Sequence, residues 1–440
     1  MNEILRRECS ERRKALMNML GERAMVIVPA AEQCLRNRDT EYRYRQDSDF
    51  YYLTGFNEPE AVLCLLPGRT GGEFVLFCRK RDRAQEIWNG YRLGQEGAVS
   101  ELGADQAFDI LELDERMPEL MSGCERIYYA LGKRTSFDRR VVSWLNQVRA
   151  KARSGIRAPQ ELLMLDHWLH DLRLFKSSEE IRLMRKAAAI SARAHERVMR
   201  MCRPGMFEYE LEAELLHEFV RSGCSAPAYT TIVGGGPRGC ILHYVENRAP
   251  LRDGELVLID AGGEYESYAA DITRTFPVGK AFSSEQRSLY EIVLAAQQQA
   301  IAQVQPDQHW NDPHDRAVRV LARGLLDEGI LNGSLDEVLE KELYRPFYMH
   351  RTGHWLGMDV HDVGDYKVDQ SWRMLEPGMV LTVEPGLYIA PDADVEERWR
   401  GIGIRIEDDV LVTRQGHEVL TEAAPKSVAD IERLRQDACS

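Results

Sequence analysis

Alternation of apolar and polar residues predicts helices and strands throughout the first 174 residues. The predicted helices cover residues 1–20 and 139–151, and the predicted strands cover 24–29, 61–67, 73–78 and 125–131. The second and third strands are joined by a glycine-rich turn, which indicates a hairpin. Mixed helices and strands of this kind indicate an α/β layer with its own core.

The pattern breaks at 154–159 and a helical stretch is predicted over 161–172. Ser177 and Glu180 have the spacing of a capping box and predict a long helix that runs to about Met201. Further helices are predicted at 208–222, 284–304 and 310–328, and strands at 229–233, 255–259, 379–383 and 402–412. The order of helices followed by strands occurs twice, which hints at an internal repeat. We therefore expect an α/β (α+β) chain with domains at 1–174 and 175–440.

Composition limits the possible partners of this chain. Its 440 residues are 44% hydrophobic and 29% charged, which fits two globular domains, and the net charge of −14 argues against binding nucleic acid. No apolar stretch approaches the length of a membrane span, and the first 20 residues lack the apolar segment of a secretion signal. Nine scattered cysteines without a CxxC pair are typical of reduced thiols. These observations predict a cytoplasmic protein with no membrane partner.

Five residues in the second half have the chemistry of metal ligands. They are Asp260, Asp271, His354, Glu384 and Glu407. Three of the acids follow apolar strand-like runs, where a buried carboxylate is costly unless it is paired or binds metal. The first two are expected to face each other across a hairpin whose second strand runs through Asp271. Four carboxylates and one imidazole form an oxygen-rich set that suits Mn, Co or Fe. Two such ions can activate water and polarise a carbonyl.

The motifs around these residues resemble those of the "pita-bread" metallopeptidases. In chain order they read LIDAG, ADITRTF, GHWLG, VEPGLY and RIEDD. Residues 45–56 resemble the N-terminal domain of aminopeptidase P, prolidase and creatinase, which methionine aminopeptidases lack. Residues 86–94 and 347–350 are most similar to the bacterial type of aminopeptidase P. The resemblance covers nearly the whole chain and implies an N-terminal creatinase/prolidase-like α/β domain followed by a pita-bread catalytic domain.

The resemblance also implies roles for the five ligands. Asp260 is expected to bind one ion through both oxygens, and Asp271 and Glu407 are expected to bridge two ions. His354 and Glu384 are expected to complete the coordination of the other ion. The implied cofactor is a pair of divalent ions, with Mn²⁺ preferred and Co²⁺, Zn²⁺ and Fe²⁺ left open.

Other positions match residues that surround the substrate in the family. His243 and His361 are expected to orient the substrate and stabilise the developing oxyanion. Arg405 and Tyr388 are expected to support the metal carboxylates from behind. Trp88 is expected to reach the active site of a neighbouring copy in a homo-oligomer, a dimer or a tetramer; the alternative is ordinary packing in a core.

One motif departs from many relatives. Where they carry glycines, this chain has Arg351 and Trp355, which are expected to narrow the pocket. The role of His350 beside Arg351 is left open between lining the site and supporting its loop.

The resemblance implies an Xaa-Pro aminopeptidase, which hydrolyses the bond before a proline in second position and releases the first residue. Glu384 is expected to carry the proton to the proline nitrogen. The alternatives are a prolidase, which cuts Xaa-Pro dipeptides, and a non-catalytic module that binds peptides. The absence of a GxSxG motif argues against a serine hydrolase.

Overall fold

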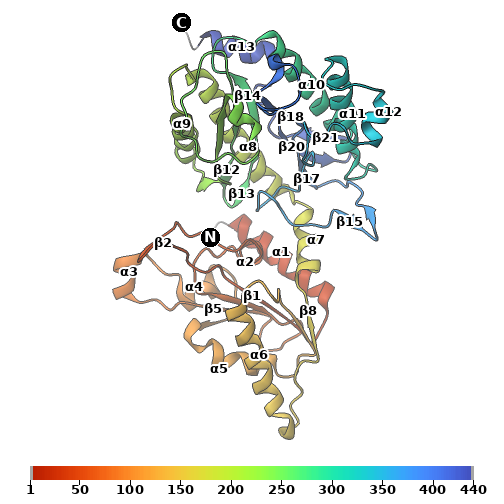
Figure 1. Ribbon diagram of the computed structural model, residues 1–440. Coiled ribbons are helices and arrows are strands. Elements are labelled where there is room, and N and C mark those ends of the chain that lie inside the picture. The colour runs from red at the N-terminus through yellow and green to blue at the C-terminus, as the bar shows by residue number, and fades with distance from the viewer. Residues whose placement is uncertain (1–2, 438–440) are drawn as a thin grey trace. The chain divides into compact units, whose positions relative to one another are not determined.

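The structure is a computed structural model that describes residues 3–437. Its chain divides into two compact units, Met1–Leu172 and Arg173–Ser440 (Figure 1). Among the described residues, no helix combines the length and the apolar character needed to cross a membrane.

The first unit is built on one mixed sheet with strand order β6-β5-β4-β1-β7-β8. Its strands are β1 (Ala24–Pro29), β4 (Val62–Leu65), β5 (Phe74–Cys78), β6 (Gln106–Asp109), β7 (Arg126–Tyr128) and β8 (Glu161–Leu163). A separate hairpin is formed by β2 (Leu35–Asn37) and β3 (Thr40–Glu41). The predicted hairpin of the second and third strands is confirmed, because β4 and β5 pair antiparallel. The central strands read as continuous apolar runs because both faces of the sheet are covered by helices.

Helices lie on both faces of this sheet (Figure 1). The helices of this part of the chain are α1 (Glu3–Leu20), α2 (Ser48–Thr54), α3 (Arg83–Asn89), α4 (Gly94–Ser100), α5 (Leu113–Met121), α6 (Thr135–Ala150) and α7 (Asp166–Leu174), with 3₁₀ turns η1 (Ile110–Glu112) and η2 (Ala152–Ser154); α3 buries none of its side chains. On one face of the sheet, α5 and α6 pack against the strands through buried side chains such as Met117, Trp144 and Ile27.

The predicted helix over 161–172 is wrong in its first part. Glu161–Leu163 forms strand β8, which pairs in parallel with β7, and the helix begins only at Asp166. A short leucine-containing run is compatible with either state, and pairing at the sheet edge decides between them.

The second unit surrounds its small sheets with helices (Figure 1). The helices are α8 (Ser178–Met201), α9 (Glu208–Arg221), α10 (Ser284–Ile301), α11 (Asp312–Asp327), α12 (Leu335–Glu340) and α13 (Val428–Asp437), with 3₁₀ turns η3 (Gly236–Cys240) and η4 (Glu397–Trp399). The predicted capping box is confirmed: Ser177 Oγ accepts from the Glu180 N–H, and the Glu180 carboxylate accepts from the Ser177 N–H. Buried residues of α8, α9, α10 and α11 form one large core with the strands.

Three sheets position the candidate site, with strand orders β10-β11-β14, β17-β20-β21 and β18-β19. These strands are β10 (Ile232–Gly235), β11 (Leu256–Asp260), β14 (Thr273–Pro277), β17 (Val380–Val383), β18 (Gly386–Ile389), β19 (Ile402–Arg405), β20 (Asp408–Thr413) and β21 (Gly416–Val419). The remaining short strands are β9 (Ala226–Pro227), β12 (Gly263–Tyr265), β13 (Tyr268–Ala269), β15 (Lys367–Val368) and β16 (Ser371–Trp372).

The predicted hairpin around the first two acids needs a correction. β11 does pair antiparallel with β14, with Asp260 opposite Thr273, but β12 and β13 form a separate small hairpin between them. Asp271 therefore lies in the connection before β14 and not in a strand. The predicted strand at 229–233 is also shorter, because only Ile232–Gly235 is paired and Tyr229 precedes it.

Candidate metal centre

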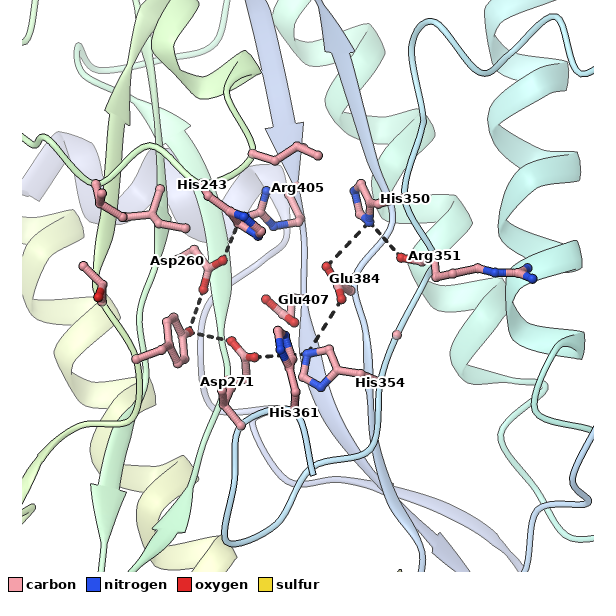
Figure 2. A pocket seen from close by; sticks show the side chains of 17 residues that line it. His243, Asp260, Asp271, His350, Arg351, His354, His361, Glu384, Arg405 and Glu407 are labelled. Carbon is pink, nitrogen blue, oxygen red and sulfur yellow. Dashed lines mark hydrogen bonds and ion pairs between the residues drawn. The ribbon is translucent and has the colours of Figure 1, made fainter. Parts of the chain in front are cut away.

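All five predicted ligand residues lie at strand ends or in the connections between elements of the second unit. Asp260 is the last residue of β11, and Asp271 lies in the connection that enters β14. Glu384 sits between β17 and β18, and Glu407 sits between β19 and β20. His354 comes from the long connection between α12 and β15. Figure 2 shows their side chains converging on one point.

Main-chain hydrogen bonds fix the two glutamates that follow strands. The Glu384 N–H donates to the Thr352 carbonyl over 2.8 Å, and the Glu407 N–H donates to the Thr273 carbonyl over 3.1 Å. A residue held by its own backbone between two strands keeps its side chain direction. Both carboxylates are thus aimed at the cavity before any ligand binds.

The orientation of His354 is set by its neighbours. Its Nδ1 lies 2.9 Å from the Trp355 carbonyl, which can only accept, so Nδ1 carries a proton. Its Nε2 lies 3.4 Å from Asp271 Oδ2 and 3.8 Å from Glu384 Oε1. Gly353 allows this loop to approach β17, because a Cβ there would lie 2.0 Å from the Thr382 carbonyl oxygen. The imidazole therefore presents Nε2 to the acids, as a metal-binding histidine does.

The converging side chains line a cavity of about 420 Å³. Its walls include every predicted ligand and most of the predicted substrate-binding residues. The predicted residues that line it are His243, Asp260, Asp271, His350, His354, His361, Glu384, Arg405 and Glu407. Tyr388 is not a wall residue, but its hydroxyl bonds to His350 Nε2 at 2.9 Å.

A buried arginine supports the acids from behind. Arg405 donates through Nη2 to Asp260 Oδ2 at 2.6 Å and through Nη1 to the Tyr388 hydroxyl at 3.1 Å. Its Nε donates to Thr273 Oγ1 at 3.1 Å, and that hydroxyl donates in turn to Glu407 Oε2 at 2.6 Å. One side chain thus contacts Asp260 directly, and Glu407 through the Thr273 hydroxyl.

Tyr229 belongs to the site, although no sequence pattern points to it. Its hydroxyl lies 2.6 Å from Asp260 Oδ1 and also contacts Asp271 Oδ1. Burial and the adjacent acids raise the pKa of Tyr229 well above its ordinary value, so the hydroxyl keeps its proton. A single tyrosine in an irregular segment has no spacing signal, and only the folded chain brings it to the acids.

The electrostatics of the cluster call for a cation. Burial raises the pKa of Glu384 to about 7, and burial with Asp271 and Glu384 raises that of Glu407 well above its ordinary value. Burial also raises the pKa of Asp260, against the opposing effect of Arg405. Burial would lower the pKa of His354, but its hydrogen bond to Asp271 and the charge of Glu384 outweigh it and raise the pKa to about 9. These are the shifts expected where ionised carboxylates crowd together without a metal to balance them.

The donor set therefore fits divalent ions. Ligand atoms of Asp271, His354 and Glu407 all lie within 4.8 Å of one another, close enough to share an ion. Asp260 and Glu384 add oxygens on the same cavity wall. Oxygen-rich sets with one imidazole suit hard or borderline divalent ions.

Three further histidines, His243, His350 and His361, line the cavity around the ligands. The rings of His354 and His361 meet edge to face with their centres 4.4 Å apart. Burial and the nearby His354 lower the pKa of His361. Burial, followed by the charge of Arg405, lowers the pKa of His350 to about 3. A neutral imidazole has one N–H. That of His350 donates to the Arg351 carbonyl, whereas that of His361 can donate to substrate.

The expected narrowing of the pocket by Arg351 and Trp355 is wrong for the tryptophan. Trp355 is fully buried away from the cavity, stacked on Tyr366 and in contact with Trp310. Its ring anchors the loop that carries His354. Arg351 does line the cavity, while its Nη1 donates to Asn311 Oδ1 at 2.9 Å. His350 lines the cavity as well, and its Nδ1 donates to the Arg351 carbonyl. It therefore both lines the site and supports the loop.

Trp88 is not a wall residue of this cavity. It lies on α3 in the first unit, and 84% of its surface is exposed, so the alternative of core packing is wrong. Its neighbours Ile87 and Tyr91 are exposed as well, and α3 buries none of its side chains. An exposed apolar group of this kind is typical of a contact surface.

The chain belongs to metallopeptidase family M24, whose model matches residues 182–414, and residues 9–128 match the model of the aminopeptidase P N-terminal domain. It is 49% identical to the Xaa-Pro aminopeptidase of Escherichia coli, over 99% of this chain and 98% of that one. It also resembles the solved structure of the Pseudomonas aeruginosa aminopeptidase PepP, with 56% identity, a TM-score of 0.98, and coverage of 99% and 98% of the two chains.

The similarity extends to a mammalian relative and to a metal-substituted structure. Human Xaa-Pro aminopeptidase 3 is 33% identical over 98% of this chain and 86% of its own length. A Zn-substituted E. coli aminopeptidase P in complex with product matches with a TM-score of 0.96 at 49% identity, covering 98% of each chain. The predicted family is thereby confirmed, and so is the predicted fold of an N-terminal aminopeptidase P domain followed by a pita-bread domain.

Proposed function

We propose that this protein is an Xaa-Pro aminopeptidase, which releases the first residue of peptides that have proline in second position. The observation that carries the proposal is the convergence of the complete ligand set on one cavity flanked by His243 and His361. Relatives that match along the whole chain carry the Xaa-Pro aminopeptidase name. Neither the prolidase nor the non-catalytic alternative is favoured, because the relatives are aminopeptidases and no ligand acid is missing.

The five residues Asp260, Asp271, His354, Glu384 and Glu407 would hold two divalent ions. Such a pair polarises the scissile carbonyl and activates water when bound. We propose Mn²⁺ as the ion in the cell, because four of the five ligands are hard carboxylates. Co²⁺, Zn²⁺ and Fe²⁺ fit the same ligands.

The residues of the chain divide the remaining work. Glu384 takes a proton from the attacking water and passes it to the proline nitrogen. His243 and His361 donate hydrogen bonds to the oxyanion that develops on the carbonyl. The free amine of the substrate lies beside Asp260, which places the cut after the first residue. Arg405, which is itself bonded to the Tyr388 hydroxyl, holds the Asp260 carboxylate in position.

Three finer features complete the proposal. We place the domain boundary at residue 174. We assign the protein to the cytoplasm, which the eight free cysteines among the described residues support. We also propose a homo-oligomer, a dimer or a tetramer, in which Trp88 contacts the active site of another copy; its 84% exposure supports this assignment.

The test compares two substrates, Xaa-Pro and Xaa-Pro-Yaa-Zaa, with chelated protein before and after addition of Mn²⁺. Metal-dependent release of the first residue from the longer peptide is expected. Cleavage of the dipeptide alone would identify a prolidase, and cleavage of neither would favour a binding module. Glu384→Gln serves as the matched control, since it keeps the shape of the side chain and removes its ability to carry a proton.

A further inference from the structure

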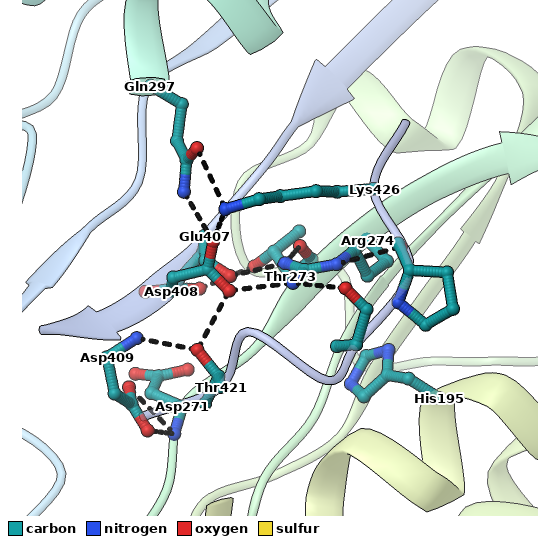
Figure 3. A network of polar contacts seen from close by, with 12 residues as sticks. His195, Asp271, Thr273, Arg274, Gln297, Glu407, Asp408, Asp409, Thr421 and Lys426 are labelled. Atoms are coloured by element: carbon teal, nitrogen blue, oxygen red, sulfur yellow. Dashed lines mark hydrogen bonds and ion pairs between the residues drawn. The ribbon is translucent and has the colours of Figure 1, made fainter. Parts of the chain in front are cut away.

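A buried polar network lies behind the metal ligands and joins β14 to the start of β20 (Figure 3). Its centre is Asp408, the residue directly after Glu407, which is fully buried. Its carboxylate accepts hydrogen bonds from four side chains, which come from β14, from α10 and from the connection between β21 and α13. The donors are Arg274 Nη2 at 2.7 Å, Gln297 Nε2 at 2.6 Å, Thr421 Oγ1 at 2.8 Å and Lys426 Nζ.

Arg274 holds the main chain at Glu407. Its Nη1 donates to the Glu407 carbonyl and, over 2.9 Å, to the Thr273 carbonyl. The same guanidinium reaches the carbonyls of Ala424 at 3.0 Å and Pro425 at 3.1 Å. Through Arg274, the peptide unit between Glu407 and Asp408 and the side chain of Asp408 are both bonded to β14. The Glu407 side chain projects from the segment that Arg274 holds.

Asp409 holds the main chain at Asp271 in a similar way. Its two carboxylate oxygens accept from the Asp271 N–H at 3.1 and 3.3 Å. Its own N–H donates to Thr421 Oγ1 at 3.0 Å, the hydroxyl that also bonds to Asp408. Asp408 and Asp409 are consecutive residues at the start of β20. Together with Arg274 they hold the main chain at Glu407 and Asp271, the two residues proposed to bridge the ions.

We propose that Asp408 and Arg274 are positioning residues of the metal centre, which set the spacing between Glu407 and Asp271. The inference rests on the proposed function, because it needs two ions at this site. Fold stability alone does not call for such a network, since apolar residues of similar volume stabilise a core as well as buried ion pairs do or better. A pair of ions about 3.5–4 Å apart does call for fixed bridging carboxylates.

The experiment compares Asp408→Asn with a control that disturbs the same unit elsewhere. Arg435 is the control residue: it is fully buried, donates to the Cys202 and Val278 carbonyls at 2.6 Å, and does not line the cavity. Calorimetric titration of chelated protein with Mn²⁺ gives the Kd of each ion. Electron paramagnetic resonance reports the spin coupling between two bound Mn²⁺ ions, and thermal melting in chelator reports stability.

Asp408→Asn is expected to raise the Kd of the second ion by about 10- to 100-fold, the usual effect of removing an outer partner of a ligand, and to weaken the spin coupling. Arg435→Met is expected to lower the Tm in chelator and to leave both Kd values equal to those of the parent chain. Equal Kd values and coupling in Asp408→Asn and the parent would overturn the proposal. If Asp408→Asn does not fold, Lys426→Met removes one of the four donors, and the same two outcomes decide. Failure of the parent chain to bind two ions would instead overturn the proposed function.

Discussion

Replacing Tyr229 by phenylalanine removes one hydroxyl and leaves the ring in place. That hydroxyl lies 2.6 Å from Asp260 Oδ1 and also contacts Asp271 Oδ1, so its proton stabilises the ionised form of two carboxylates. A hydrogen bond to a charged group contributes about 1.5–3 kcal/mol. Ions bind the ionised acids, so the lost stabilisation appears in metal affinity. At about 1.4 kcal/mol per factor of ten, the Kd is expected to rise by roughly 10- to 100-fold.

The assay is calorimetric titration of chelated Tyr229→Phe with Mn²⁺ at pH 7 and again at pH 9. Because the hydroxyl acts by favouring ionised carboxylates, the higher pH is expected to recover part of the affinity. Tyr268→Phe is the matched control: its hydroxyl donates to buried Glu180 Oε1 at 2.8 Å, away from the cavity. Identical affinities of Tyr229→Phe and the parent chain at pH 7 would refute the reasoning.

Three other changes test the site. In chelator, the raised pKa values of His354, about 9, and Glu384, about 7, mean that the folded chain binds more protons than the unfolded one. The Tm is therefore expected to fall as the pH rises from 5 to 9. Added Mn²⁺ should abolish this fall, and a Tm that rises with pH in chelator would contradict the assignment. His361→Ala is expected to lower kcat by about 100- to 1,000-fold with unchanged ion affinity, and steady-state kinetics beside titration checks this. Gly353→Ala would place a Cβ 2.0 Å from the Thr382 carbonyl oxygen; a loss of about 1–3 kcal/mol in the free energy of unfolding is expected, measured by urea denaturation, and an unchanged midpoint would show that the loop yields.

Much of the site could be read from local sequence. An apolar run that ends in an acid marks a strand whose last residue must find a partner, and this applies to Asp260 and Glu384. The capping box at Ser177 and the hairpin of the second and third strands are local signals too, and both occur as predicted. The metal-ligand motifs carried the family assignment.

The rest depends on contacts that only the folded chain creates. Tyr229 lies in none of the metal-ligand motifs, and Asp409 lies in one only as the neighbour of a ligand; both reach the ligands by tertiary packing. Trp355 is expected from its motif to narrow the pocket, yet its side chain turns into the core because Trp310 and Tyr366 offer aromatic partners there. Strand β8 forms because β7 presents a free edge, which no property of residues 161–163 reveals.

The hydrogen bond from Arg405 to Asp260 joins residues 145 positions apart, and Arg274 bonds to the carbonyl of Pro425 across 151 positions. During synthesis the ribosome adds about 5–20 residues per second, so the earliest ligand waits at least several seconds for its last partners. A nascent or truncated chain that stops before Glu407 lacks a complete cavity. Metal loading is therefore a late event that reports completion of the whole catalytic unit, and peptide hydrolysis cannot begin on a partly made chain.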